Sequence, residues 1–256
     1  MAVSNPVKSK IGKELSIDDG AIATNALRIK IDGKELAVPE GTTILKAAKD
    51  NGIIIPSLCE VEGLTPYGGC RLCLVEISGS PKLFPACTTP IGPNMEITTK
   101  SDKLKEYRKM TVQMLLSERT HICSSCVSNN HCELQALADE LGVDHVMFER
   151  QWTNKEVDST HEFLVIDRNR CILCTRCIRV CDQIEGVHTL DLKMRGKSTD
   201  VIIDLDEKWV NSCSCTSCRK CAKVCPVGAI YIENEPIEKT KRKDIVEFIV
   251  QRRNRK

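Results

Sequence analysis

The chain has 16 cysteines in 256 residues, and their spacing is the feature of the sequence with the clearest chemistry. A Cys-x2-Cys loop places two thiolate sulfurs on one side and leaves backbone N–H groups free to bond inorganic sulfide, which suits iron–sulfur clusters. Disulfides are the alternative, but residues 1–20 are polar and charged and lack the apolar segment of an export signal. We therefore expect a cytoplasmic, reduced chain whose cysteines bind metal.

Two cysteine runs in the last third follow the spacing of bacterial 4Fe-4S ferredoxins. Each reads Cys-x2-Cys-x2-Cys-x3-Cys, and the second lies 44 positions after the first, from Cys171 to Cys215. Pro226 follows the second run, whereas Asp182 follows the first. In this pattern the fourth cysteine of each run crosses to the other cluster. The sequence thus predicts one 4Fe-4S cluster on Cys171, Cys174, Cys177 and Cys225 and another on Cys215, Cys218, Cys221 and Cys181.

The first four-cysteine set is spaced more widely and predicts a 2Fe-2S cluster. Plant-type 2Fe-2S ferredoxins use a shorter first gap and a distant fourth ligand, so this set is a variant of that site. A four-cysteine zinc site is the alternative, although structural zinc usually joins two tight Cys-x2-Cys pairs. The expected ligands, in the order Cys-x10-Cys-x2-Cys-x13-Cys, are Cys59, Cys70, Cys73 and Cys87.

The middle of the chain has only three suitably spaced cysteines, Cys123, Cys126 and Cys132. A third 4Fe-4S cluster at this place needs a fourth ligand from elsewhere. His121 is the nearest candidate, and His131 and the spare Cys213 are the others. A lone histidine more often has a structural role, so this ligand is the least determined of the sixteen.

A strand, a strand and a helix are expected just before the first cysteine set. Residues 27–38 alternate apolar and polar side chains around Asp32-Gly33, a pair that favours a tight hairpin turn. Thr42 is the expected cap of the helix, and Asn51-Gly52 its stop. Strand, strand and helix in this order predict a β-grasp domain. The expected apolar face of the helix consists of Ile44, Leu45, Ala47 and Ala48.

Two further helices are expected on either side of the middle cysteines. Residues 102–118 have helical spacing of apolar residues, with Ser101 available as a cap. A second helix is expected from Glu133 to Leu141, ending at Gly142. The residues expected to form the core face of the first helix are Leu104, Tyr107, Met110, Met114 and Leu115.

The predicted fold class is α+β, with a β-grasp 2Fe-2S ferredoxin-like domain, a small helical His/Cys3 cluster domain and a bacterial-type two-cluster 4Fe-4S ferredoxin domain. The expected divisions are 1–25 for an N-terminal extension, 26–103, 104–157 and 158–236 for these domains, and 237–256 for a basic C-terminal tail. Lys and Arg in the tail surround the apolar segment IVEFIV, so the tail is either a solvated face or a helix that docks a partner.

The order of these sites resembles one family. Tyr67-Gly68-Gly69 and the first cysteine set are similar to the N-terminal 2Fe-2S domain of the complex I large iron–sulfur subunit, of iron-only hydrogenases and of NAD-linked nickel–iron hydrogenases. In complex I the histidine ligand stands four residues before the first middle cysteine, where this chain has Arg119. The segments CELQ at 132–135 and CILCTRCIRVCD at 171–182, and the offset of His121, resemble the small iron–sulfur (diaphorase) subunit of Hox-type, NAD-reducing nickel–iron hydrogenases. This chain departs from it in a longer N-terminus, Cys213 and the basic tail.

The resemblance implies an electron relay without a catalytic residue of its own. It implies FMN and NAD on a flavin/NAD-binding diaphorase subunit, a nickel–iron hydrogenase module of small and large subunits, and ferredoxin as a further candidate partner. No G-x-G-x-x-G follows a strand, no stretch is apolar enough for a membrane span, and the formal net charge of +2 gives no reason to expect nucleic acid. A relay in an NAD-dependent formate dehydrogenase or other complex I-like oxidoreductase, and a zinc-rich binding module, are the competing hypotheses.

Overall fold

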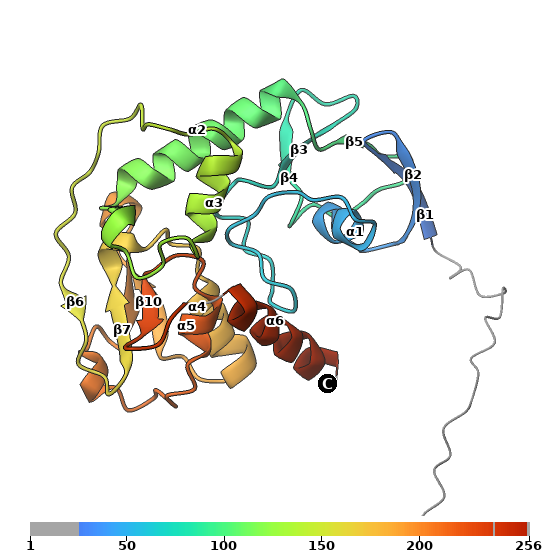
Figure 1. The fold of residues 1–256 in the computed structure, drawn as a ribbon. Coiled ribbons are helices and arrows are strands. Elements are labelled where there is room, and N and C mark those ends of the chain that lie inside the picture. Colours follow the sequence, from blue (N-terminus) through green and yellow to red (C-terminus); the bar gives the residue numbers. More distant parts are fainter. Residues whose placement is uncertain (1–25, 238, 255–256) are drawn as a thin grey trace, which may run out of the picture.

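The computed structural model describes residues 26–237 and 239–254, and its N-terminal part is built on a five-stranded sheet (Figure 1). The expected extension 1–25 lies outside these residues. Strands β1 (Ala26–Ile31) and β2 (Lys34–Pro39) form the predicted hairpin, with Asp32 at φ 49° and Gly33 at φ 81° in the turn. Strands β3 (Leu74–Ile77), β4 (Leu83–Pro85) and β5 (Glu96–Thr98) complete the order β2-β1-β5-β3-β4. The β1–β5 pair is parallel and the other pairs are antiparallel.

Helix α1 (Ile44–Asp50) packs on this sheet with the four predicted apolar residues buried. Its cap is Thr43, whose side chain accepts a hydrogen bond from the Lys46 N–H, so the prediction of Thr42 was wrong by one position. The reason is that the Thr42 backbone is already bonded, its N–H to the Pro39 carbonyl and its carbonyl to the Ile91 N–H. The helix therefore begins one residue later.

Helix α2 (Asp102–Glu118) joins the sheet to the middle of the molecule (Figure 1). Ser101 caps it as predicted, accepting from the Leu104 N–H at 3.2 Å. The predicted core face was wrong in part, because Tyr107, Met110 and Met114 are exposed by 41%, 38% and 46%. The buried stripe instead contains Arg108, whose guanidinium donates to the carbonyls of Leu72 at 3.1 Å and Leu74 at 2.9 Å. These bonds turn a polar residue toward the sheet.

A short 3-10 turn, η1 (Cys123–Ser125), and helix α3 (Glu133–Glu140) follow. Gly142 has φ 66°, and the Val143 N–H returns to the Ala138 carbonyl at 2.8 Å. The left-handed glycine therefore ends α3 where the sequence predicted.

The last third holds two small sheets and a pair of short helices. Strands β6 (Val157–Asp158), β7 (Leu164–Asp167) and β10 (Ile230–Ile232) form one antiparallel sheet in the order β10-β7-β6. Strands β8 (Leu190–Lys193) and β9 (Asp200–Ile203) form a hairpin. The helices are α4 (Arg176–Val180) and α5 (Lys220–Val224). The short turns are η2 (Arg168–Arg170), the π-helical η3 (Cys181–Glu185), η4 (Gly196–Ser198) and η5 (Trp209–Asn211).

The internal repeat of the sequence recurs in the backbone. Leu173 (φ 53°) and Thr175 (φ 58°) are left-handed in the first run, and Ser217 (φ 53°) and Arg219 (φ 62°), 44 positions later, are left-handed in the second. Non-glycine residues adopt this conformation at a cost of roughly 1–3 kcal/mol, so it persists where surrounding contacts impose it. The two runs therefore have the same loop shape.

Helix α6 (Lys239–Asn254) closes the fold beside α4 and α5 (Figure 1, red). Ile245 and Ile249 are 7% and 0% exposed, and they pack within one cluster that also contains Val61, Leu64, Val180, Ile184 and Val224. The apolar centre of the tail is thus used inside this chain, and the idea that it docks a partner is wrong for that face. In the part of the chain that the structure describes, no helix is long and apolar enough to cross a bilayer.

Candidate metal centres

The first cysteine set converges in the loops around β3 and β4. Cys59, Cys73 and Cys87 are 0%, 1% and 1% exposed, and Cys70 is 8% exposed. The thiols hydrogen-bond to one another: Cys59 with Cys70 and Cys87, and Cys73 with Cys87. These bonds lower the pKa of Cys59 and of Cys73 and raise the pKa of Cys70 and of Cys87. The four predicted ligands therefore form one buried group of sulfurs.

Two glycines are required beside this group. A Cβ on Gly69 would lie 2.2 Å from the Tyr67 ring, and Gly68 has φ 72°. The same tight loop lets the Leu58 N–H donate to the Cys70 sulfur at 3.4 Å. Backbone donors of this kind can bond cluster sulfur.

The second group combines α4 with the end of α5. Burial raises the pKa of Cys171 to about 12, and the neighbouring Cys174 and Cys225 add to this rise. The pKa of Cys177 is raised by burial and then by Cys174, Cys171 and Cys225. Cys225 comes from the second run but lies with Cys171, Cys174 and Cys177 of the first. This arrangement agrees with the predicted crossing of the fourth cysteine.

The third group mirrors the second. Burial raises the pKa of Cys221, and the neighbouring Cys218, Cys181 and Cys215 raise it further. All four cysteines line one cavity together with Trp209. The Trp209 indole N–H donates to the Cys215 sulfur at 3.3 Å. Cys181 therefore sits with the second run.

The middle group consists of Cys123, Cys126, Cys132 and His121, which line one cavity. The His121 Nε2 atom is buried and has no hydrogen-bond partner in the part of the chain that the structure describes, while the ring bonds the backbone of Leu115. Burial lowers the pKa of His121 to about 4, helped by Arg119 and Arg170. The imidazole thus stays neutral, which is the form that ligates metal, and its free nitrogen is available.

The other two candidates for the fourth ligand lie elsewhere. His131 lines a neighbouring groove with Ile54, Ser57 and Cys132, and Cys213 is exposed. Neither lines the cavity that the three middle cysteines share with His121.

Gly228 is a site residue that sequence reasoning missed. A Cβ at this position would lie 2.9 Å from the Cys126 sulfur and 3.1 Å from the Ser128 Cβ. The residue follows Cys225 by three positions and belongs to the ferredoxin run, so no local pattern connects it with Cys126.

Residues in or beside the second group connect it to the other three, through hydrogen bonds of flanking residues and one electrostatic interaction. Arg179 of α4 donates to the carbonyls of Cys59 and Cys174, the latter at 3.3 Å, and to the Thr65 carbonyl at 2.8 Å. The Glu133 N–H donates to the Pro226 carbonyl at 2.8 Å, next to Cys225. Cys177 also interacts electrostatically with Cys221. The set around Cys171 is therefore the junction of the four.

The donor sets have the chemistry of iron–sulfur cluster ligands. Among the described residues, no group of three or more His, Cys, Asp or Glu is arranged to hold one metal ion. Fifteen thiols and one unpaired imidazole nitrogen lie in four groups, and the thiols with raised pKa values must lose protons when metal binds. Thiolate and imidazole are ligands of protein iron–sulfur centres.

Three family models match the chain in the order of these groups. Residues 24–102 match a 2Fe-2S iron–sulfur cluster binding domain, residues 108–147 an NADH-ubiquinone oxidoreductase-G iron–sulfur binding region, and residues 162–231 the ferredoxin-like domain of NADH-quinone oxidoreductase subunit 3. The fold and its cysteine groups thus define an iron–sulfur protein with 2Fe-2S and 4Fe-4S binding regions.

Similarity to known proteins identifies the family within this class. The chain is 31% identical over 206 residues to the gamma subunit of the NAD-reducing hydrogenase HoxS of Cupriavidus necator, covering 80% of this chain and 86% of that one. It belongs to the family of that iron–sulfur subunit. A solved NAD+-reducing [NiFe]-hydrogenase, in the H2-reduced state, contains a chain that matches with a TM-score of 0.77 and 30% identity, over 85% of this chain and 91% of that one.

Longer proteins match as well. The HndD subunit of the NADP-reducing hydrogenase of Solidesulfovibrio fructosivorans is 36% identical over 219 residues, and this chain spans 37% of its length. The alpha subunit of the NADPH-Fe(3+) oxidoreductase of Geobacter sulfurreducens is 34% identical over 202 residues, and this chain spans 24% of it.

Proposed function

We propose that this chain is the electron-relay subunit of a cytoplasmic, NAD-linked nickel–iron hydrogenase complex. It passes single electrons between a flavin/NAD subunit, which holds FMN and NAD, and a hydrogenase module of small and large subunits. The observation that carries the proposal is the junction: Arg179 bonds the loops of Cys59 and Cys174 to each other, Glu133 bonds Pro226 beside Cys225, and Cys177 interacts electrostatically with Cys221. A contiguous set of one-electron sites suits transfer over a distance that one site cannot bridge.

The proposed ligand sets are those predicted from the sequence. Cys59, Cys70, Cys73 and Cys87 hold 2Fe-2S, and three 4Fe-4S clusters take the remaining sets, with His121 as the non-cysteine ligand. The sheet order with its parallel central pair supports a β-grasp domain at 26–103, followed by a His/Cys3 domain and a two-cluster ferredoxin domain. When bound, each cluster accepts and releases one electron.

The protein itself contributes position and surroundings. Burial of the cysteines keeps water away from the groups around Cys59 and Cys171, while Cys123 is exposed. Arg179 holds the loop of Cys59 against that of Cys174, which fixes the separation of two groups. Fixed separation matters because electron transfer weakens steeply with distance.

Affinity purification of the tagged chain under anaerobic conditions tests the function. We expect a flavin subunit and nickel-containing hydrogenase subunits to co-purify, and NADH to bleach the visible absorption of the complex. The isolated, cluster-loaded chain should not oxidise NADH. NADH oxidation by the isolated chain, or a complex without nickel, would overturn the proposal.

A relay in another complex I-like oxidoreductase is the second candidate. It is favoured by the 34% identity, over 207 residues, to one of the NADH-quinone oxidoreductase proteins of Rhizobium meliloti. The same purification separates the two, because that candidate requires a flavin subunit without a nickel–iron partner.

The His121 assignment has its own test. His121→Ala should alter one 4Fe-4S electron paramagnetic resonance (EPR) signal and leave the 2Fe-2S signal intact, since His121 lines the cavity of the middle cysteines and its Nε2 atom has no hydrogen-bond partner among the described residues. His131→Ala is the matched control and should leave all signals unchanged. Should the two variants give identical spectra, His121 is not the ligand.

A further inference from the structure

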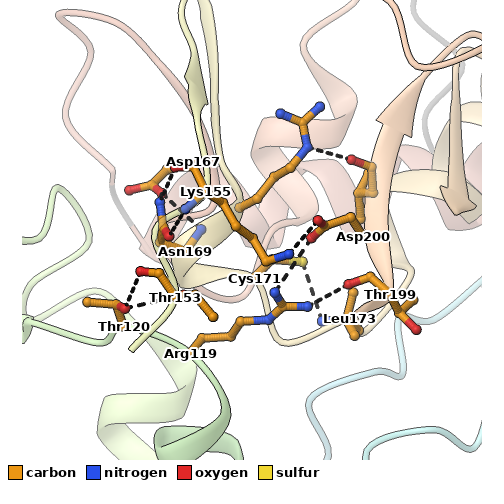
Figure 2. Close-up of polar contacts among 12 residues, drawn as sticks. Arg119, Thr120, Thr153, Lys155, Asp167, Asn169, Cys171, Leu173, Thr199 and Asp200 are labelled. Atoms are coloured by element: carbon orange, nitrogen blue, oxygen red, sulfur yellow. Dashed lines mark hydrogen bonds and ion pairs between the residues drawn. The ribbon is translucent and has the colours of Figure 1, made fainter. Parts of the chain in front are cut away.

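Arg119 is a buried arginine that interacts electrostatically with His121 of the middle group and with Cys171 of the second group. It follows the last residue of α2, two positions before His121, and is 2% exposed. Its Nη2 atom donates to the Thr199 carbonyl at 2.6 Å, and its Nη1 atom lies 3.6 Å from Asp200 Oδ1 (Figure 2). These contacts hold the guanidinium against the start of β9.

The charges around Arg119 do not cancel. Asp200 also accepts a bond from Lys155 Nζ at 2.5 Å, so two cations share one carboxylate (Figure 2). The side chains of Arg119, Asp200 and Lys155 are 1%, 10% and 21% exposed. One positive charge is therefore left in a region with little water, where a buried charge is costly unless something compensates it.

The guanidinium also has unused donors. Within the described residues, Arg119 Nε and Nη1 are buried and have no hydrogen-bond partner. The neighbouring Arg170 pairs with Asp167 at 2.9 Å, and among the described residues its Nη1 atom is likewise buried without a hydrogen-bond partner. Arg119 thus shares its carboxylate partner, Asp200, with Lys155 and keeps buried N–H donors unused among the described residues.

The Cys171 thiol, which loses its proton when metal binds, is the proposed cluster ligand whose charge Arg119 affects. The two interact electrostatically, and Figure 2 labels both side chains in one close-up, without a bond between them. Cys171 Sγ already accepts one backbone bond, from the Leu173 N–H at 3.4 Å. A thiolate-ligated iron–sulfur cluster is an anion that gains a further negative charge on reduction.

We propose that Arg119 is a positioning residue whose uncompensated charge raises the reduction potential of the 4Fe-4S cluster at Cys171, the junction of the relay. This inference rests on the proposed function, because it assumes a cluster on the Cys171 set. A positive charge stabilises the reduced, more negative state more than the oxidised state, so it makes the junction cluster easier to reduce.

Potentiometric EPR titration of the cluster-loaded chain tests the inference. The signal to follow is the one that Cys171→Ser changes; if that variant changes no signal, the ligand assignment of the proposed function fails instead. Arg119→Met should shift the midpoint potential of this signal to a more negative value by about 59 mV. That shift corresponds to a change of about tenfold in the oxidised-to-reduced ratio. Arg119→Lys keeps the positive charge, so the midpoint potential of its Cys171 signal should lie close to that of the unmodified chain.

Arg108→Met is the matched control. Arg108 is also buried and bonds two backbone carbonyls, but it lies beside Cys73 in the first group. This variant should affect the 2Fe-2S signal and leave the Cys171 signal at its midpoint.

Asp200→Asn should shift the midpoint potential in the opposite direction to Arg119→Met. Removing the carboxylate leaves more positive charge, so the Cys171 midpoint should become more positive, and this result stands even if Arg119→Met does not fold. Damage to packing would not produce opposite shifts from the two partners of one ion pair. An unchanged midpoint in Arg119→Met, or a negative shift in Asp200→Asn, overturns the inference.

Discussion

Gly228→Ala is the substitution that most directly tests how the middle cluster site is built. The new Cβ would lie 2.9 Å from the Cys126 sulfur, 3.1 Å from the Ser128 Cβ and 3.2 Å from the Val127 Cγ2. All three atoms belong to one loop, and ordinary contact begins at 3.4 Å, so the loop must move by about 0.5 Å. Crowding of this kind costs about 1–3 kcal/mol.

That cost falls on the ligand loop and thus on the retention of one cluster. Because a factor of ten corresponds to about 1.4 kcal/mol, the middle site should bind its cluster roughly 5- to 150-fold more weakly. Two iron atoms in one cluster and four in each of three others make about 14 iron atoms per chain. After gel filtration, Gly228→Ala should approach about 10, with the 2Fe-2S signal intact.

Gly92→Ala is the matched control for this experiment. Its Cβ would meet only the Met95 side chain, at 3.4 Å, and like Gly228 it has no left-handed backbone angle. It should keep the full iron content. If Gly228→Ala also keeps it, with an unchanged set of 4Fe-4S signals, then Gly228 does not abut the middle site as the structure places it.

Two further substitutions test the surroundings of other sites. Arg179→Met removes the bonds to the carbonyls of Cys59, Thr65 and Cys174. It should lower the free energy of unfolding by about 2–5 kcal/mol in anaerobic urea titrations. A change below about 0.5 kcal/mol would refute the idea that Arg179 holds the two loops together. Trp209→Phe keeps the ring but removes the N–H bond to the Cys215 sulfur at 3.3 Å, so potentiometric titration should find one 4Fe-4S midpoint more negative, and an unshifted midpoint would show that this bond does not act on the cluster.

The sequence predicted local features well where the physical rule is local. Ser101 caps α2 and Asp32-Gly33 turns the β1–β2 hairpin, because a cap or a turn depends on a few adjacent residues. The face that α2 buries was predicted less well. Apolar spacing favoured Tyr107, Met110 and Met114, whereas distant carbonyls of β3 and its preceding loop attract Arg108. Helical periodicity contains no information about such partners.

The sequence by itself determined which cysteines form close pairs, since Cys-x2-Cys loops constrain sulfur positions through a few covalent bonds. The tertiary structure decided how the groups adjoin. Arg179 reaches the Cys59 carbonyl 120 positions away, and Arg119 pairs with Asp200. These contacts arise when separate segments pack together, so no spacing along the chain predicts them.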